Sequence, residues 1–238
     1  MTTSYPANLR DVRGLRTDDD RIVRRGVLYR SEVPLSGRAE GTDVAVWPPA
    51  DVIDLRTPEE RRGQHALAAP GTTVHAVPMG ASLAPALRTA QTSDADLSDA
   101  YRHLARDAAG AVARIAGIVA SSSGPVLVHC TAGKDRTGIV VAVLLRAVGV
   151  RRADVMADYL RTEDNLPRLW ELLRSAGIPE PRNRALLGVQ ASALESVLDE
   201  IESAEGGAVG WLSAHGVDGP TLARLAERLL SPVYAPVP

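Results

Sequence analysis

The sequence predicts a single α/β domain with a mainly parallel central sheet, flanked by helices and followed by a helical C-terminal half. In the first 150 residues, short apolar runs closed by proline or glycine alternate with stretches of helical periodicity, as expected of parallel strands joined by helices. Beyond residue 150 the pattern is helical. No segment is long and polar enough to act as a linker, so we treat residues 1–238 as one domain.

Four segments have the composition of β-strands. Residues 22–32 mix β-branched and polar residues, as an edge strand or a hairpin would. Residues 51–56 and 73–79 are short apolar runs that indicate buried strands. Residues 125–130 read PVLVHC, and such a continuous apolar run is typical of the central strand of a parallel sheet.

Helical periodicity is strongest over residues 97–120, where apolar residues recur every three or four positions. We predict one long amphipathic helix there, with Asp94, Asp96 or Ser98 as its N-cap. A second, apolar helix over 138–149 is too short to span a bilayer and is predicted to be buried. Further helical segments cover residues 154–160, 166–177, 185–206 and 221–230.

Composition excludes several classes of protein. The chain has 238 residues, of which 45% are hydrophobic and 24% charged, so it is not intrinsically disordered. Its net charge of −2 argues against a nucleic-acid partner, which usually requires a basic surface. The N-terminal residues lack the apolar stretch of a Sec-type signal peptide. We therefore expect no membrane span and a protein that is cytoplasmic, or exported without a Sec-type signal.

Cysteine and lysine each occur once. Cys130 is the single cysteine, so the chain can form neither an internal disulfide nor a site with several thiolate ligands. Lys134 is the single lysine among 27 basic residues. A compact ammonium is not equivalent to the planar fork of arginine. Both residues lie in one short segment, which is therefore the first place to look for chemistry.

Residues 129–138 read HCTAGKDRTG and connect the predicted central strand to the buried helix. A tight turn at a helix N-terminus directs several backbone N–H groups at one point and so forms a nest for an anion. Gly133 allows backbone conformations that other residues avoid, and Gly138 is expected to let the helix pack close to the sheet. Arg136 can bind two oxygens of a phosphate group at once.

Cys130 is predicted to lie at the base of this nest. A thiol at a helix N-terminus and beside basic side chains ionises readily, and a thiolate below a bound phosphate is a nucleophile directed at phosphorus. The loop therefore predicts phosphoryl transfer through a phosphocysteine. Because backbone N–H groups and Arg136 supply the charge stabilisation, we expect no metal and no other cofactor.

The pattern His-Cys-x5-Arg-Thr resembles the active-site signature of the cysteine-dependent protein tyrosine phosphatase superfamily, in particular a bacterial branch of it. The resemblance implies that Cys130 is the nucleophile and Arg136 the phosphate clamp. It also implies that Thr137 donates its hydroxyl to the thiolate released in the second step, and that His129 orients the loop. The backbone donors would be Thr131, Ala132, Gly133, Lys134 and Asp135. Four flanking segments extend the resemblance over most of the chain: NLRDVRG at 8–14, LYRSEVPLSG at 28–37, VIDLRTPEER at 52–61 and ADYLRTEDNLP at 157–167.

The general acid departs from the common superfamily pattern. Members often carry an Asp after Trp-Pro on a loop before the cysteine, but the Trp-Pro pair at 47–48 is followed by Pro-Ala. The bacterial branch carries the same Lys-Asp-Arg triplet, which makes Asp135 the preferred proton donor to the leaving oxygen. The alternatives are Asp94, Asp96 and Asp99, for which helix capping is the expected role.

Two basic residues near the loop have alternative roles. Lys134 either meets a second phosphate or a substrate carboxylate at the rim, which would resemble phosphoinositide-directed members of the superfamily, or forms a salt bridge with a nearby acid. Arg56 follows a strand at the edge where α/β proteins bind ligands, so it either approaches the substrate or pairs with nearby acids. The remaining histidines are not spaced like the ligands of a metal site, and we expect them to be polar residues of the surface or the core. They are His65, His75, His103 and His215.

These observations predict a phosphatase that hydrolyses phosphate monoesters. Its partners would be phosphorylated proteins, carrying phosphotyrosine and also phosphoserine or phosphothreonine, or phospholipids such as phosphoinositides. Phosphate and vanadate should bind as ligands. Two alternatives remain open: a catalytically silent phosphate-binding module and a cysteine-based sulfurtransferase. In the bacterial branch, helices such as those over 166–204 can cover the site, so this segment is a candidate lid with Gly177 and Gly188 as hinges.

Overall fold

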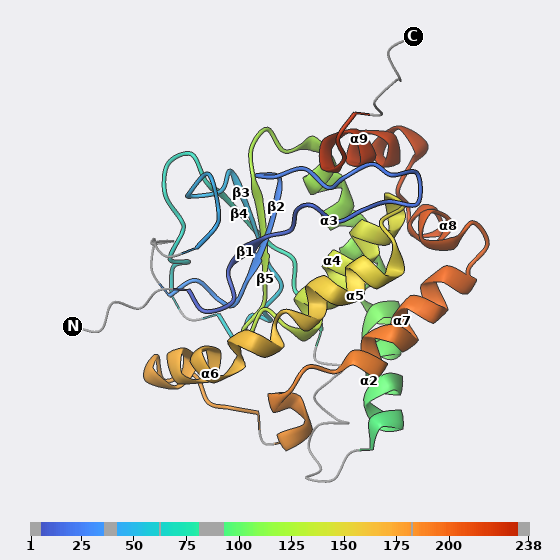
Figure 1. The fold of residues 1–238 in the computed structure, drawn as a ribbon. Coiled ribbons are helices and arrows are strands. Elements are labelled where there is room, and N and C mark those ends of the chain that lie inside the picture. The colour runs from blue at the N-terminus through green and yellow to red at the C-terminus, as the bar shows by residue number, and fades with distance from the viewer. Residues whose placement is uncertain (1–5, 36–41, 62, 81–92, 182, 233–238) are drawn as a thin grey trace.

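A five-stranded sheet lies at the centre of the molecule, with strand order β1-β2-β5-β3-β4 (Figure 1). The computed structural model describes residues 6–35, 42–61, 63–80, 93–181 and 183–232. The strands are β1 (Arg10–Asp11), β2 (Leu28–Ser31), β3 (Asp51–Asp54), β4 (Thr73–Ala76) and β5 (Val126–His129). β1 runs antiparallel to β2, and the other neighbouring strands are parallel. The predicted α/β fold with a mainly parallel sheet is confirmed.

The position of each strand in the sheet corrects two expectations. β5 is central and all of its residues are buried, as its apolar sequence predicts. β2 is not an edge strand, because β1 pairs with its outer side, and this antiparallel pair agrees better with the hairpin alternative. β4 was expected to be buried, but it forms the opposite edge of the sheet and none of its residues is fully buried.

The helices pack mainly on one face of the sheet (Figure 1). They are α2 (Asp94–Asp107), α3 (Ala109–Ser121), α4 (Asp135–Ala147), α5 (Arg152–Leu160), α6 (Leu166–Ser175), α7 (Ala191–Ser203), α8 (Gly207–Ala214) and α9 (Gly219–Leu229). The single long helix predicted over 97–120 is two helices, because the chain leaves helical geometry at Ala108, where φ is −94° and ψ is 6°. α2 packs on α7 and α3 on α9, so the break gives each half its own partner.

The N-cap of α2 is Ser93 rather than any of the three predicted residues. Its side chain accepts a hydrogen bond from the backbone N–H of Asp96, and the carboxylate of Asp96 accepts one from the backbone N–H of Ser93 at 3.0 Å. This reciprocal pair is a capping box. Asp96 therefore has the capping function expected of it, although at the third helical position.

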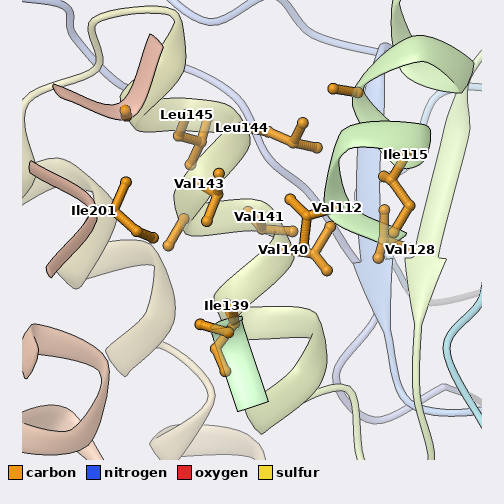
Figure 2. Close-up of a cluster of buried hydrophobic side chains, with 14 of the residues drawn as sticks. Val112, Ile115, Val128, Ile139, Val140, Val141, Val143, Leu144, Leu145 and Ile201 are labelled. Atoms are coloured by element: carbon orange, nitrogen blue, oxygen red, sulfur yellow. The ribbon is translucent and has the colours of Figure 1, made fainter. Parts of the chain in front are cut away.

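α4 is the most deeply buried helix, as its apolar sequence predicts. Figure 2 shows its side chains, among them Val140 and Val143, within a cluster that also contains Val112 of α3, Val128 of β5 and Ile201 of α7. A helix that is apolar on every side must be covered on every side. This enclosure fixes the N-terminus of α4, which lies within the 129–138 segment.

The C-terminal half differs in detail from the prediction. The helix expected over 185–206 is a short 3-10 helix at Arg184–Leu187 followed by α7. α8 was not predicted, because Gly206 and Gly207 resemble a helix end in the sequence. Both glycines have positive φ, 79° and 61°, and they turn the chain into α8 instead.

The second face of the sheet is covered mainly by loops in the part of the chain that the structure describes. Tyr29, Val52 and Leu127 point to this face and pack with Leu67 and, at the edge, Trp47. No helix of the described residues is long and apolar enough to cross a membrane.

Candidate active site

The segment predicted to carry the chemistry lies at the carboxyl end of the central strand. β5 ends at His129, Cys130 follows it, and α4 begins at Asp135. Cys130 is 3% exposed. Sites in open α/β sheets form at this edge, where loops leave neighbouring parallel strands. We call residues 130–136 the Cys130 loop.

Three carbonyl groups of the Cys130 loop are hydrogen-bonded by its surroundings. The carbonyl of Cys130 lies 3.1 Å from Nδ1 of His129, and the carbonyl of Thr131 accepts from the N–H of Val33 at 3.0 Å. The carbonyl of Gly133 accepts from Arg30 and Asn8, at 3.2 and 3.3 Å. In a trans peptide the C=O and the following N–H point in opposite directions. The N–H groups of the next residues therefore point away from these partners.

Those N–H groups also have no acceptor in the part of the chain that the structure describes. Within the described ranges, no hydrogen bond is made by the backbone N–H groups of residues 131–136. A run of unpaired N–H donors beside a helix N-terminus is an anion-binding arrangement. The nest predicted from the sequence is thus compatible with the way in which the surrounding strands hold the loop.

Glycine is required at position 133. Its φ is +65°, and an added Cβ would overlap the backbone of Ser31 and Glu32. Gly138 serves a different contact from the one predicted. A Cβ there would lie 2.7 Å from Cε2 of Tyr159, so the close approach is to a side chain of α5 rather than to the sheet.

A buried ionic cluster lies behind Gly133. Arg30 donates to Asp158 at 2.7 Å as well as to the Gly133 carbonyl, and Arg10 donates to the other carboxylate oxygen of Asp158 at 3.0 Å. Burial raises the pKa of Asp158, but the charges of Arg30 and Arg10 outweigh burial and the net shift is downward. No role was predicted for these residues, although they lie in the flanking segments that resemble the phosphatase superfamily.

Glu60 holds Arg136, and the sequence did not predict this pair. Its two carboxylate oxygens lie 2.6 Å from Nη1 and 2.6 Å from Nη2 of Arg136. Glu60 also accepts from the Thr131 hydroxyl at 2.7 Å. Burial would raise the pKa of Glu60, but the hydrogen bonds and charge of Arg136 lower it to about 2. Glu60 comes shortly after β3, the neighbour of β5, which is the one sequence signal of its proximity.

Arg56 forms the ion pair that was one of its two predicted roles. Its Nε and Nη2 donate to the two oxygens of Asp54, at 2.9 and 2.8 Å, and its backbone N–H donates at 3.0 Å. The partner is Asp54 rather than Glu59 or Glu60. The side chain is 12% exposed, and its charge is paired with that of Asp54.

His129 and His65 contact each other, which was not expected of His65. Their Nε2 atoms are 2.9 Å apart, and Nδ1 of His65 accepts from the N–H of Leu67 at 3.1 Å. Burial lowers the pKa of His129 to about 3, against the opposing charge of Asp54, and burial also lowers the pKa of His65. Both imidazoles are therefore neutral at pH 7.

Asp54, His65 and His129 could by distance hold a metal ion, since one ligand atom from each lies within 4.8 Å of the others. Each of the three already has a partner. Asp54 is paired with Arg56, and the imidazoles are joined by a hydrogen bond. We therefore interpret the group as a hydrogen-bonded support for the Cys130 loop.

Lys134 lies inside the protein rather than at the rim. Its side chain is 0% exposed, and Nζ lies 2.6 Å from Oδ1 of Asp135. The structure thus contains the salt bridge that was one of the two predicted roles of Lys134. Asp135, at the first position of α4, also accepts a hydrogen bond on Oδ1 from the Tyr101 hydroxyl of α2, and it is 19% exposed.

The other two candidate acids lie on α2, away from these contacts. Asp94 is the first residue of the helix, and Asp99 pairs with Arg102 on the exposed side. Neither residue makes a hydrogen bond to the Cys130 loop, all of which the structure describes. Thr137, by contrast, is fully buried at the start of α4, and its hydroxyl has no hydrogen-bond partner among the described residues.

A cavity of about 560 Å³ opens beside the Cys130 loop. Thr131 and Glu60 form part of its wall, together with Arg56, His65 and residues 176–179 that follow α6. α6 packs against Ala132 through Leu169 and Leu173. α7, the other helix of the candidate lid, belongs to the main core, so the cavity is bordered by the α6 end of that segment.

Comparison with known proteins agrees with this geometry. Residues 2–231 match the model of the tyrosine phosphatase family. The chain is 30% identical to the triple specificity protein phosphatase PtpB of Mycobacterium tuberculosis, over 94% of this chain and 96% of that protein. It is 36% identical to a tyrosine-protein phosphatase of Nostoc commune, over 47% of this chain and 41% of that protein. The chain therefore belongs to the tyrosine phosphatase family, and its activity is that of a phosphatase.

Proposed function

We propose that this phosphatase hydrolyses phosphate monoesters through a phosphocysteine on Cys130. The observation that carries the proposal is the run of unpaired N–H groups over residues 131–136, held at the end of β5 around a nearly buried cysteine. Such donors stabilise the equatorial oxygens of a phosphoryl group as it transfers, without reorganisation during the reaction.

The reaction has two steps. The Cys130 sulfur attacks phosphorus, the P–O bond to the leaving group breaks, and the leaving oxygen takes a proton from a general acid. Water then attacks the phosphocysteine and gives its proton to the carboxylate that the general acid has become, the P–S bond breaks, and inorganic phosphate leaves. The thiolate released at this stage carries negative charge, which a hydroxyl donor can stabilise. We assign this role to Thr137, because its buried hydroxyl makes no hydrogen bond to any described residue.

Arg136 is the proposed phosphate clamp, and Glu60 limits how it can bind. Nη1 donates to Glu60 and, at 3.3 Å, to the Leu55 carbonyl, while Nη2 donates to Glu60 and lies 3.5 Å from the Thr131 hydroxyl. A guanidinium has five N–H donors. The Nε donor and the weakly used Nη2 donor are therefore the pair available for two phosphate oxygens. Glu60 supports the proposal by fixing the plane of this fork.

Asp135 is the proposed general acid. Its Oδ1 accepts from both Lys134 and Tyr101, so Oδ2 is the oxygen on which a transferable proton can be carried. The side chain is partly exposed, as a group that contacts a substrate must be. Because Lys134 is occupied by this contact, a second phosphate at Lys134 has no support. We therefore propose phosphorylated proteins as the substrates. The location of the protein, either in the cytoplasm or outside the cell after export without a Sec-type signal, stays a prediction.

Hydrolysis of para-nitrophenyl phosphate by wild type and Cys130→Ser tests the proposal. We expect turnover by wild type in the presence of a chelator, no turnover by the variant, and competition by vanadate. A phosphorylated protein trapped by rapid acid quench should carry its phosphate on Cys130. Full activity of Cys130→Ser, or loss of the wild-type rate with chelator, would contradict the phosphocysteine mechanism.

A further inference from the structure

The cavity beside the Cys130 loop is where the remainder of a substrate must lie. Thr131 belongs to the loop and Glu60 binds Arg136, and both form part of the cavity wall. An ester with its phosphate in the nest therefore extends its other groups into this space. The charges of the wall then decide which groups are accepted, and this argument rests on the function proposed above.

The positive charges of the described wall are neutralised. Arg56 donates two hydrogen bonds to the carboxylate oxygens of Asp54. Lys134 does not belong to the wall and is buried against Asp135. His65, also in the wall, is neutral at pH 7 because burial lowers its pKa. A second phosphate entering the cavity would find no unpaired cation among the described residues that line it.

One negative charge of the wall is left over. Glu60 is paired with Arg136, whereas Glu59 is exposed and forms no ion pair within 4 Å among the described residues. A hydrogen bond with Thr57 and, more weakly, the charge of Arg61 lower the pKa of Glu59, so it is ionised at pH 7. When a phosphate dianion shares Arg136, Glu60 also loses part of its neutralising partner. The wall therefore becomes more negative as the substrate binds, and it attracts positive charge.

Part of the cavity wall is apolar. The wall also contains the apolar side chains of Val33, Pro34 and Ile178. The carbon chain of an arginine or lysine packs well on such a surface while its charged end reaches a carboxylate. From this arrangement we propose that the preferred substrate is a phosphopeptide with arginine or lysine directly beside the phosphorylated residue, recognised through Glu59.

The test compares three phosphotyrosine peptides that differ at one flanking position, with Arg, Ala or Glu there. For wild type we expect kcat/KM to be about tenfold higher for the Arg peptide than for the Glu peptide, since an exposed ion pair is replaced by repulsion. Dissociation constants for Cys130→Ser should follow the same order. A phosphatidylinositol monophosphate in neutral vesicles is measured in parallel and should be a poorer substrate than the Arg peptide.

Variants at Glu59 assign the preference to this carboxylate. Glu59→Gln should remove most of the difference between the Arg and Glu peptides, and Glu59→Lys should reverse its sign, while Glu227→Gln on α9 should leave it unchanged. Equal rates for the three peptides, an unchanged ratio in Glu59→Lys, or preference for the vesicle lipid would overturn the inference. If no ester is hydrolysed by wild type but the Cys130→Ser dissociation constants keep their order, the proposed function fails and the charge preference stands.

Discussion

Nε2 of His65 lies 2.9 Å from Nε2 of His129, and the direction of this hydrogen bond is determined. The N–H of Leu67 donates to Nδ1 of His65, so a neutral His65 carries its proton on Nε2 and donates to His129. His129 then carries its proton on Nδ1, where it donates to the Cys130 carbonyl. His65 is thus a positioning residue that acts on the Cys130 loop through His129.

Replacing His65 tests this chain of hydrogen bonds. His65→Leu should lower kcat about tenfold, the equivalent of one lost hydrogen bond of about 1.4 kcal/mol, whereas His65→Gln keeps a donor and should recover most of the rate. The pH dependence of Cys130 alkylation by iodoacetamide should shift in the Leu variant and return in the Gln variant. If Gln behaves like Leu in both measurements, His65 acts only through packing.

The neutral state of His129 makes folding stability depend on pH. Its pKa is about 3 in the folded protein and about 6.5 when exposed, so between these values the unfolded chain binds the additional proton. Stability therefore falls with falling pH by about 1.4 kcal/mol per unit from this residue. Asp11 has the opposite effect below pH 6, because burial raises its pKa to about 6.

The contribution of His129 is isolated by difference. Urea unfolding at pH 5.0 and 6.0 is compared for wild type and His129→Gln, so that Asp11 contributes equally to both. The wild type should lose about 1 kcal/mol more than the variant over this interval. An equal loss in both proteins would mean that His129 titrates normally in the fold.

Asp135→Asn distinguishes a general acid from a structural residue. The variant keeps an oxygen acceptor for Lys134 and Tyr101 but cannot donate a carboxylic proton. Turnover of an alkyl phosphate should fall about 100-fold or more, because its leaving group needs a proton, and that of an aryl phosphate with an acidic phenol should fall by less than about tenfold. Equal losses on both esters would assign the proton to another group.

Thr137→Val should stabilise the protein while slowing its second step. The Thr137 hydroxyl is buried without a described partner, and replacing it with a methyl group of similar size removes an unsatisfied polar group. We expect a gain of about 1 kcal/mol, or about 2–4 °C in Tm. Rapid-mixing kinetics should show a burst of phenol release followed by slow hydrolysis of the phosphocysteine. A lower Tm would reveal a hydrogen bond that the hydroxyl makes in solution.

Gly133→Ala and Gly14→Ala form a matched pair. Both glycines have positive φ, +65° and +74°, but a Cβ at Gly14 meets no atom within 4 Å, whereas one at Gly133 overlaps the backbone of Ser31. Gly14→Ala should cost about 1 kcal/mol, from backbone strain alone. Gly133→Ala should cost about 3 kcal/mol or more and abolish activity, because the backbone of the Cys130 loop must shift. Similar losses in thermal unfolding would show that the overlap is easily relieved.

Contiguous residues were sufficient to predict much of the site. A buried strand, a turn with glycine and a buried helix follow one another without interruption, so the sequence predicts that Cys130 and Arg136 share one short loop at the end of the central strand. The break at Ala108 and the helix after Gly206 were missed, because helical periodicity continues through the first and glycine normally ends a helix at the second. Burial of Lys134 was equally hidden, since the Asp135 carboxylate that it contacts is also bound by Tyr101 of α2, which is distant in the sequence.

The sequence by itself determined the α/β class and the order of strand, loop and helix around Cys130, and it predicted the nest, because these follow from short runs of neighbouring residues. Only the tertiary structure decided what supports the nest. Glu60 reaches Arg136 and His65 reaches His129 because β3 lies beside β5, and Arg30 reaches Gly133 because β2 lies on the other side. Strand order depends on packing energies summed over the whole core, and no single segment carries that information.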